Sequence, residues 1–127
     1  MDYKGTAKAV FLISAIYDFL LGLIFFLFYK QIFNTFSISI PQYPEYLQMS
    51  AAFVATLGIG YYFIYKNIEN NADLWKLGIF YKIVYSLLVL YYYFVVGTAN
   101  RLFLYFVIID MLFLIPFIWL YNKVYTS

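Results

Sequence analysis

Four long runs of apolar residues, separated by short polar segments, dominate the pattern of the chain. They cover roughly residues 8–29, 46–65, 75–96 and 101–122. Each run has close to the ~20 residues that a helix needs to cross the ~30 Å hydrocarbon layer of a bilayer. The first run is too long for a signal peptide and lacks a small-residue cleavage site, so we expect it to be a retained span.

The links between the runs contain residues that begin and cap helices. Pro44 suits the first turn of the second helix. Asn71 or Asp73 can cap the third helix, and Asn100 can cap the fourth. Because short links place consecutive helices side by side and antiparallel, the sequence predicts a single all-α domain over residues 1–127. This domain is expected to be an integral membrane protein folded as an up-down four-helix transmembrane bundle.

The composition points to the same class of protein. Of the 127 residues, 66% are hydrophobic and only 11% are charged, against roughly 25% charged residues in an ordinary soluble domain. A soluble fold of this size could not cover so much apolar surface, whereas a lipid bilayer tolerates it. The net charge of +2 offers too little basic surface for nucleic acid, so we expect the bilayer and not nucleic acid as a partner.

The chain contains no cysteine and no histidine. This excludes disulfides, thiol redox chemistry, His-ligated haem and a Ser-His nucleophile, and it removes the usual ligands of structural zinc. We therefore expect no cofactor, no metal site and no catalytic residue. Carboxylates and tyrosines could still perform acid-base chemistry, so an enzyme is retained as the weaker alternative.

Basic residues are distributed unequally between the two sides of the predicted bundle. With four spans both termini share a side, and that side collects five basic residues against two on the other. The five are Lys4, Lys8, Lys66, Lys76 and Lys123, and the two are Lys30 and Arg101. Because cytoplasmic loops carry the excess of lysine and arginine, we expect both termini on the cytoplasmic side.

Three ionisable residues, Asp18, Lys82 and Asp110, lie well inside the predicted spans. They lie roughly 15, 11 and 18 Å from the cytoplasmic ends of their spans, at similar depth. Ser14 precedes Asp18 by one helical turn and Ser86 follows Lys82 by one turn, so each charge shares a face with small or polar residues that we expect to look into the bundle. Lys82 could snorkel to the headgroups. The aspartates lack that reach, so we expect Lys82 to pair with Asp18, Asp110 or both.

Two interpretations of these charges are open from the sequence. One ammonium and two carboxylates carry a net charge of −1, so one carboxyl is expected to hold a proton that a sodium ion or an amine ligand could replace. Tyr61 and Tyr85 lie in the same half of the bilayer and could donate hydrogen bonds to the carboxylates or to a ligand. The expected ligand-binding residues are therefore Asp18, Lys82, Asp110, Tyr61, Tyr85, Ser14 and Ser86. Alternatively, the charges form only a structural clasp that fixes which helices meet.

Small residues recur at four-residue spacing in the second run. Ala51 and Ala55 form one row, and Ala52, Thr56 and Gly60 form another. Such rows allow helices to approach closely. Four short spans also enclose little interior, so we expect a homo-oligomer or a complex with a membrane-protein partner.

A family resemblance rests on four segments: YDFLLG at 17–22, GIGYY at 58–62, GIFYK at 78–82 and IIDMLF at 108–113. In these segments, in its length and in its number of spans, the chain resembles the small bacterial four-span proteins grouped as DoxX-like. It departs from them in having no acidic residue within the small-residue part of the second run. The resemblance implies a location in the bacterial plasma (inner) membrane, and it implies no activity and no site residues.

Taken together, these features favour a small membrane protein that binds an ion or a small ligand at an intramembrane Asp/Lys/Asp cluster, in order to transport or to sense it. The alternative is an accessory or structural subunit that associates with another membrane protein or with itself.

Overall fold

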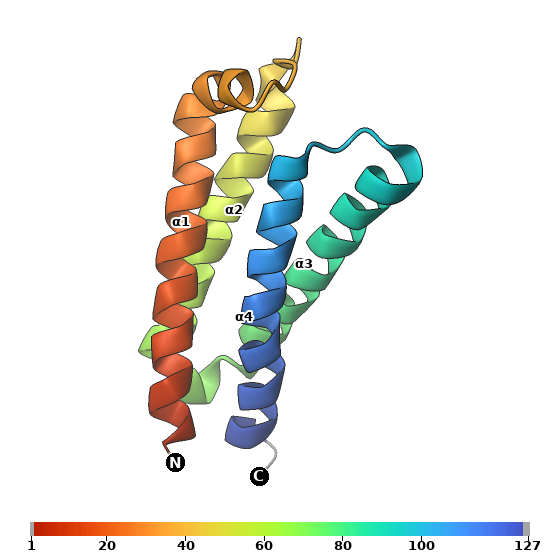
Figure 1. Ribbon diagram of the computed structural model, residues 1–127. Coiled ribbons are helices and arrows are strands. Elements are labelled where there is room, and N and C mark those ends of the chain that lie inside the picture. Colours follow the sequence, from red (N-terminus) through yellow and green to blue (C-terminus); the bar gives the residue numbers. More distant parts are fainter. Residues whose placement is uncertain (1, 126–127) are drawn as a thin grey trace.

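The computed structural model describes residues 2–125, and four long helices account for most of them. Their bounds are α1 (Tyr3–Thr35), α2 (Pro44–Lys66), α3 (Ala72–Tyr91) and α4 (Arg101–Tyr125). A 3-10 turn, η1 (Ile68–Asn70), follows α2, and a π-helical turn, η2 (Tyr92–Val96), continues α3. The start of α1 and the end of α4 lie at the same end of the molecule (Figure 1). All four helices, α3 together with η2, are long and apolar enough to cross a membrane.

The helices extend beyond the predicted spans, most clearly at α1. Its backbone departs from helical geometry at Phe28, where φ is −123° and ψ is 25°. The part of α1 after Phe28 turns across the end of the bundle (Figure 1). This bend falls where the first apolar run ends and where Lys30 and Gln31 follow. The straight part of α1 therefore corresponds to the predicted span.

Of the residues predicted at the starts of the second, third and fourth helices, those of the second and fourth are confirmed. Pro44 occupies the first turn of α2, and Asn100 caps α4 because its Oδ1 accepts a hydrogen bond from the Leu102 amide at 2.9 Å. The side-chain cap predicted for α3 is not formed. Asn71 stands at the cap position, but its amide group donates to the backbone oxygen of Asn67 at 2.8 Å and so serves the end of α2 instead.

Glycine allows α1 and α2 to touch along their length. A Cβ added at Gly22 would lie 2.4 Å from the backbone oxygen of Ala51 and 2.5 Å from the backbone nitrogen of Ala55. A Cβ added at Gly58 of α2 would lie 2.5 Å from the backbone nitrogen of Phe19. Only glycine leaves room for this approach at either position.

The two small-residue rows of α2 have different surroundings. Ala51 is buried and faces α1, as the predicted close packing requires. Ala52 and Thr56 of the second row are exposed, and the Thr56 hydroxyl donates to the Ala52 backbone oxygen of its own helix at 2.9 Å. The contact of α2 with α1 therefore uses the first row, and of the second row only Gly60 is half-buried, next to Leu74 of α3.

Aromatic rings fill the end of the bundle where α1 begins and α4 ends. Phe11, Tyr61, Trp75 and Phe117 are all buried there, and we call them the aromatic core. The ring centroid of Phe11 lies 4.5 Å from those of Trp75 and Phe117. The indole Nε1 of Trp75 donates to the backbone oxygen of Phe117 at 2.9 Å, so α1, α2, α3 and α4 are tied together at this end.

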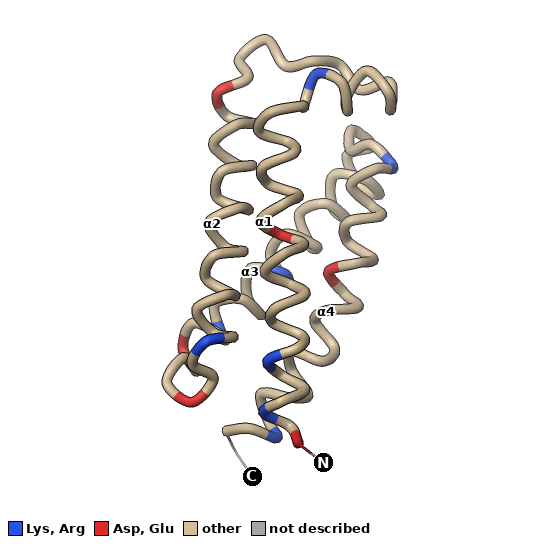
Figure 2. The backbone as a smooth tube through the Cα atoms, turned by 90° about the vertical axis from the view of Figure 1, so that its left-hand side faces the viewer, with Lys and Arg blue, Asp and Glu red and all other residues tan. Residues whose placement is uncertain are grey.

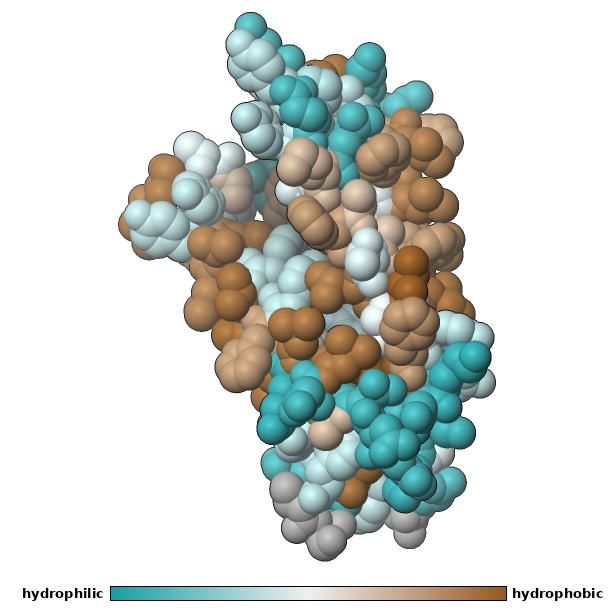
Figure 3. All heavy atoms as spheres, turned by 180° about the vertical axis from the view of Figure 1, so that it is seen from behind, coloured by the Kyte–Doolittle hydropathy of each residue, from teal (hydrophilic) through white to brown (hydrophobic). Residues whose placement is uncertain are grey.

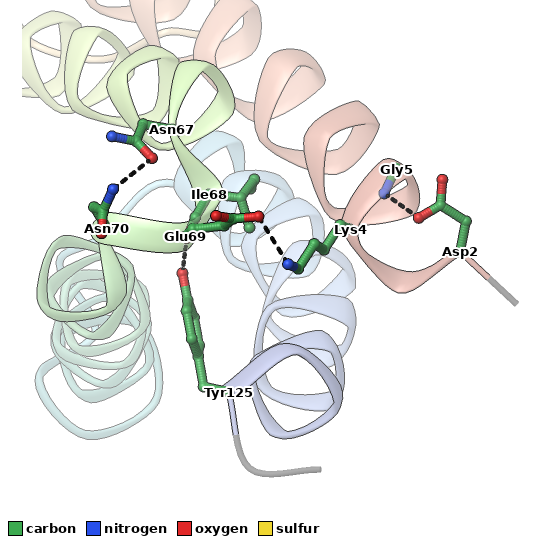
Figure 4. Close-up of polar contacts among 8 residues, drawn as sticks. All are labelled: Asp2, Lys4, Gly5, Asn67, Ile68, Glu69, Asn70 and Tyr125. Atoms are coloured by element: carbon green, nitrogen blue, oxygen red, sulfur yellow. Dashed lines mark hydrogen bonds and ion pairs between the residues drawn. The ribbon is translucent and has the colours of Figure 1, made fainter.

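The turn η1 closes the same end (Figure 4). The hydroxyl of Tyr125 donates to the backbone oxygen of Ile68. Beside it, Lys4 Nζ lies 2.9 Å from Glu69 Oε1. The hydrogen bond from Lys4 holds the pKa of Glu69 below its ordinary value.

Large apolar side chains point outward from every helix. Leu27, Phe53, Leu87 and Ile115, one on each of the four, are all more than half exposed. On the face seen in Figure 3, hydrophobic residues cover the middle of the molecule and hydrophilic residues lie at both ends. Such a surface is stable in contact with hydrocarbon and costly in water.

The helix α3 leans away from the other three as it runs from the aromatic core toward η2 (Figure 1). Seen from behind, the end of α3 and the turn η2 project from the side of the molecule (Figure 3). The bundle is thus closed at the aromatic core and wider toward η2, and this difference positions the site described next.

Candidate functional site

Three helices bring the ionisable residues together in the interior. Asp18 comes from α1, Lys82 from α3 and Asp110 from α4. Lys82 Nζ lies 3.1 Å from Asp110 Oδ1 and 3.9 Å from Asp18 Oδ2. The Lys82 side chain is 0% exposed, so it does not snorkel, and the carboxylate side chains are 3% and 7% exposed. The predicted pairing of Lys82 with both aspartates is therefore present in the structure.

The helical spacing explains why the charges point inward. On α1, Ser14, Asp18 and Gly22 recur every four residues, and all three are buried. On α3, Lys82 and Ser86 do the same. Residues four apart on a helix share a face, so each charge belongs to a face that packs against the other helices.

An aromatic pocket encloses the ammonium of Lys82. Its Nζ lies 5.4 Å from the ring centroid of Tyr61, 5.1 Å from that of Phe113 and 5.5 Å from that of Phe117. These distances allow cation–π attraction, which is strongest where water is excluded. The sequence had singled out Tyr61 as a hydrogen-bond donor, whereas the structure places its ring beside the ammonium of Lys82.

Several polar atoms around the charges lack a hydrogen-bond partner within residues 2–125. They are Ser14 Oγ, Tyr17 Oη, Asp18 Oδ2, Tyr61 Oη and Ser86 Oγ. The hydrogen bond expected from Tyr61 to a carboxylate is therefore not formed, because the ring of Tyr61 faces Lys82 and its edge approaches Gly78. Buried polar groups without partners are uncommon, and five of them around one cluster mark this region as unusual.

A cavity of about 120 Å³ reaches the cluster from the wider part of the bundle. Most of its wall is apolar and comes from α1, α2 and α4. These wall residues include Leu21, Phe25, Leu47, Val54, Phe103 and Phe106. A pocket with apolar walls and a few converging polar groups is the usual form of a small-molecule site.

Apart from Ser50, whose hydroxyl donates to the Tyr46 backbone oxygen of its own helix at 3.0 Å, the polar groups on this cavity are acidic and phenolic. Asp18 and Asp110 line it, together with Tyr17, Tyr81 and Tyr85. Lys82 is not among the described residues that line it, nor are Tyr61, Ser14 and Ser86. Of the seven residues predicted for the site, Asp18, Asp110 and Tyr85 thus line the cavity and the other four do not.

Tyr17 and Tyr81 also line the cavity, although they were not among the seven residues predicted for the site. Tyr17 adjoins Asp18 in the chain, and Tyr81 adjoins Lys82, so neither shares the helical face of the charge next to it. Their place on the cavity depends on how the helices pack, which no local pattern reveals. Within residues 2–125 no group of three or more Asp, Glu, His or Cys side chains converges as a metal site would require.

The arrangement offers a buried carboxylate pair to a small molecule, with phenolic hydroxyls beside it and the balancing ammonium on the far side. Binding is the chemistry that this geometry can perform directly, since it shows no nucleophile with an adjacent base. Comparison of the chain with protein-family models, curated proteins and solved structures finds no match to any of them.

Proposed function

We propose that the chain is a multi-pass protein of the bacterial inner membrane that binds a small ligand or ion in the cavity ending on Asp18 and Asp110. In this proposal the four helices cross the bilayer in up-down order. The outward apolar side chains support a bilayer location. The resemblance to DoxX-like proteins supports the choice of a bacterial inner membrane.

The distribution of charge supports a cytoplasmic position for both termini. Lysines and arginines are more frequent at the end where α1 begins and α4 ends than at the opposite end (Figure 2). Cytoplasmic segments of membrane proteins carry this excess. With this orientation the aromatic core lies on the cytoplasmic side and the cavity opens in the other half of the bilayer.

The proposal of binding rests on one observation: the buried carboxylates of Asp18 and Asp110 form part of the cavity wall. A clasp that only fixes helix pairing is satisfied by solid packing around the ion pairs. Here Asp18 and Asp110 instead line a hollow of about 120 Å³. For comparison, an engineered enclosed cavity of about 150 Å³ accepts benzene. The present cavity is not fully enclosed, so it is suited to a molecule with one benzene-sized apolar group that can extend through the opening. Binding at this depth is a requirement shared by a transporter and a membrane sensor.

Val54 provides a way to test whether the cavity binds ligands. It lines the cavity, whereas Val84 of α3 is 54% exposed on the outer surface. Val54→Phe should obstruct the cavity, and Val84→Phe makes the same substitution away from it. The probes are benzylamine, benzyl alcohol, sodium benzoate and sodium chloride, each titrated into purified protein in lipid nanodiscs. The measurement is the midpoint of thermal unfolding.

We expect at least one probe to raise the midpoint saturably in the wild type and in Val84→Phe but not in Val54→Phe. Ligands that bind only the folded state raise its stability in this way. If every probe acts alike on the two phenylalanine variants, the cavity is not a binding site. The role as an accessory subunit, with the charges as a clasp, then replaces the present proposal.

We also propose that the protein self-associates or binds another membrane protein, because a bundle of only four helices encloses little interior. The exposed row of Ala52 and Thr56 leaves a small-residue surface on α2 open to a neighbouring helix. The mass of the protein in detergent, measured by light scattering during size-exclusion chromatography, tests self-association. A monomer mass across a range of protein concentrations would exclude a stable homo-oligomer.

A further inference from the structure

The cavity meets only the acidic side of the charged cluster. Asp18 and Asp110 line it, while the ammonium of Lys82 is enclosed by the rings of Tyr61, Phe113 and Phe117. A molecule in the cavity therefore faces carboxylates and does not face the ammonium. An anion would be repelled by the carboxylates, and no lysine or arginine is among the described residues that line the cavity.

The two carboxylates are not equally satisfied. Asp110 accepts a hydrogen bond from Lys82 Nζ at 3.1 Å. Asp18 lies 3.9 Å from the same nitrogen, beyond hydrogen-bond distance. Its Oδ2 accepts no hydrogen bond from any described residue, and the residue is only 2% exposed. A buried carboxylate oxygen without a donor is costly, so Asp18 is the carboxylate of the two that could still accept from a positive group carrying N–H donors.

The remaining walls decide which kind of cation would fit. A bare metal ion needs several oxygen ligands, but most of this wall is hydrocarbon and aromatic ring. An organic ammonium supplies its own N–H donors to Asp18, and its apolar part can contact Leu21, Phe25 and Phe106. The rings of Tyr17, Tyr81 and Tyr85 add faces that attract a cation and hydroxyls that can accept from it.

We infer that the ligand of this cavity is a small organic amine in its protonated form. Its ammonium contacts the Asp18 carboxylate, and its compact apolar group lies against the hydrophobic part of the cavity wall. This inference rests on the proposed function, because it names the class of ligand for the same cavity. It assigns Asp18 as the direct partner of the ligand, Asp110 as the partner of Lys82, and the three tyrosines as the flanks of the ammonium.

The first experiment compares three probes of nearly the same shape on the wild-type protein in nanodiscs. Benzylamine is positive at neutral pH, benzyl alcohol is neutral and benzoate is negative. Dissociation constants come from equilibrium dialysis, with protein-free nanodiscs to subtract partition into lipid. We expect benzylamine to bind about tenfold or more tightly than benzyl alcohol, the effect of one charge-assisted hydrogen bond. Benzoate should not bind measurably.

The second experiment removes the negative charge from the cavity. Asp18→Asn keeps the shape of the side chain, and Asp73→Asn removes the same charge from a fully exposed position on α3. We expect Asp18→Asn to weaken benzylamine binding by about tenfold or more and to leave the affinity for benzyl alcohol nearly unchanged. Asp73→Asn should bind both probes as the wild type does.

The outcomes separate this inference from the proposed function. If benzyl alcohol or benzoate binds as tightly as benzylamine while Val54→Phe still blocks binding, the cavity is a site but not one for cations. If no probe distinguishes Val54→Phe from Val84→Phe, the proposed function itself fails. Should Asp18→Asn not fold, the order of affinities for the three probes on the wild type decides the matter without any variant.

Discussion

Lys82→Met removes the central charge of the cluster and keeps most of the length of the side chain. At an effective dielectric constant of about 20, the Coulomb attraction is about 5 kcal/mol for the 3.1 Å pair with Asp110 and about 4 kcal/mol for the 3.9 Å pair with Asp18. The substitution also removes the desolvation cost of the ammonium, which is several kcal/mol. The net loss should be about 3–5 kcal/mol of unfolding free energy, the range seen when one partner of a buried pair is removed.

The assay is reversible unfolding in mixed micelles with increasing denaturing detergent, followed by the fluorescence of the buried Trp75. Lys76→Met is the matched control, since Lys76 lies on the same helix with its side chain half exposed, and it should leave the transition unchanged. The triple variant Lys82→Met, Asp18→Asn, Asp110→Asn leaves no unpaired charge in the cluster, so it should regain most of the stability. If Lys82→Met unfolds at the same detergent concentration as Lys76→Met, the ion pairs do not hold the bundle together and the reasoning is refuted.

Three further predictions concern parts of the fold around the site. Gly22→Ala should lower the unfolding free energy by about 1–3 kcal/mol because its Cβ would strike the α2 backbone. Gly60→Ala, whose Cβ would make an ordinary van der Waals contact with Leu74 at 3.9 Å, should be neutral or stabilising in the same unfolding assay. Trp75→Phe should lower the unfolding free energy by about 1–3 kcal/mol, because the indole hydrogen bond is lost. Trp119→Phe, at an exposed position, should lower it clearly less. Equal losses of unfolding free energy would contradict the role given to the aromatic core. The lowered pKa of Glu69 contributes stability that is present above its unfolded pKa and lost as the pH falls through its folded pKa, so Glu69→Gln should flatten the acid side of a plot of unfolding midpoint against pH.

The four helices and the pairing of the charges could be predicted because both follow from the order and spacing of residues along the chain. The length of an apolar run fixes where a spanning helix can lie, and the cost of a buried charge requires Asp18 and Asp110 to find a cation. Lys82 is the only cation at that depth in the sequence. Four-residue spacing then places Ser14, Asp18 and Gly22 on one face without any knowledge of the fold.

The division of the cluster into two sides could not be predicted in this way. It depends on how α1, α3 and α4 pack together, with Lys82 beside aromatic rings and Tyr81 on the cavity. The sequence also could not predict which of the two small-residue rows of α2 packs against α1, because this depends on which face of α2 meets Gly22. Tertiary geometry of this kind comes from the packing of many side chains together and leaves no periodic signal in a single helix.

The placement of the three charges on three different helices also has a consequence for biogenesis. A single Asp or Lys at the centre of an inserting helix costs about 2.5–3.5 kcal/mol on insertion scales, and each of α1, α3 and α4 carries one. In the proposed multi-pass arrangement, each of these three helices enters the membrane with a charge that has no partner on its own helix. Contact among α1, α3 and α4 relieves this cost fully, so a chain truncated before α4 should be a preferred substrate for membrane quality-control proteases.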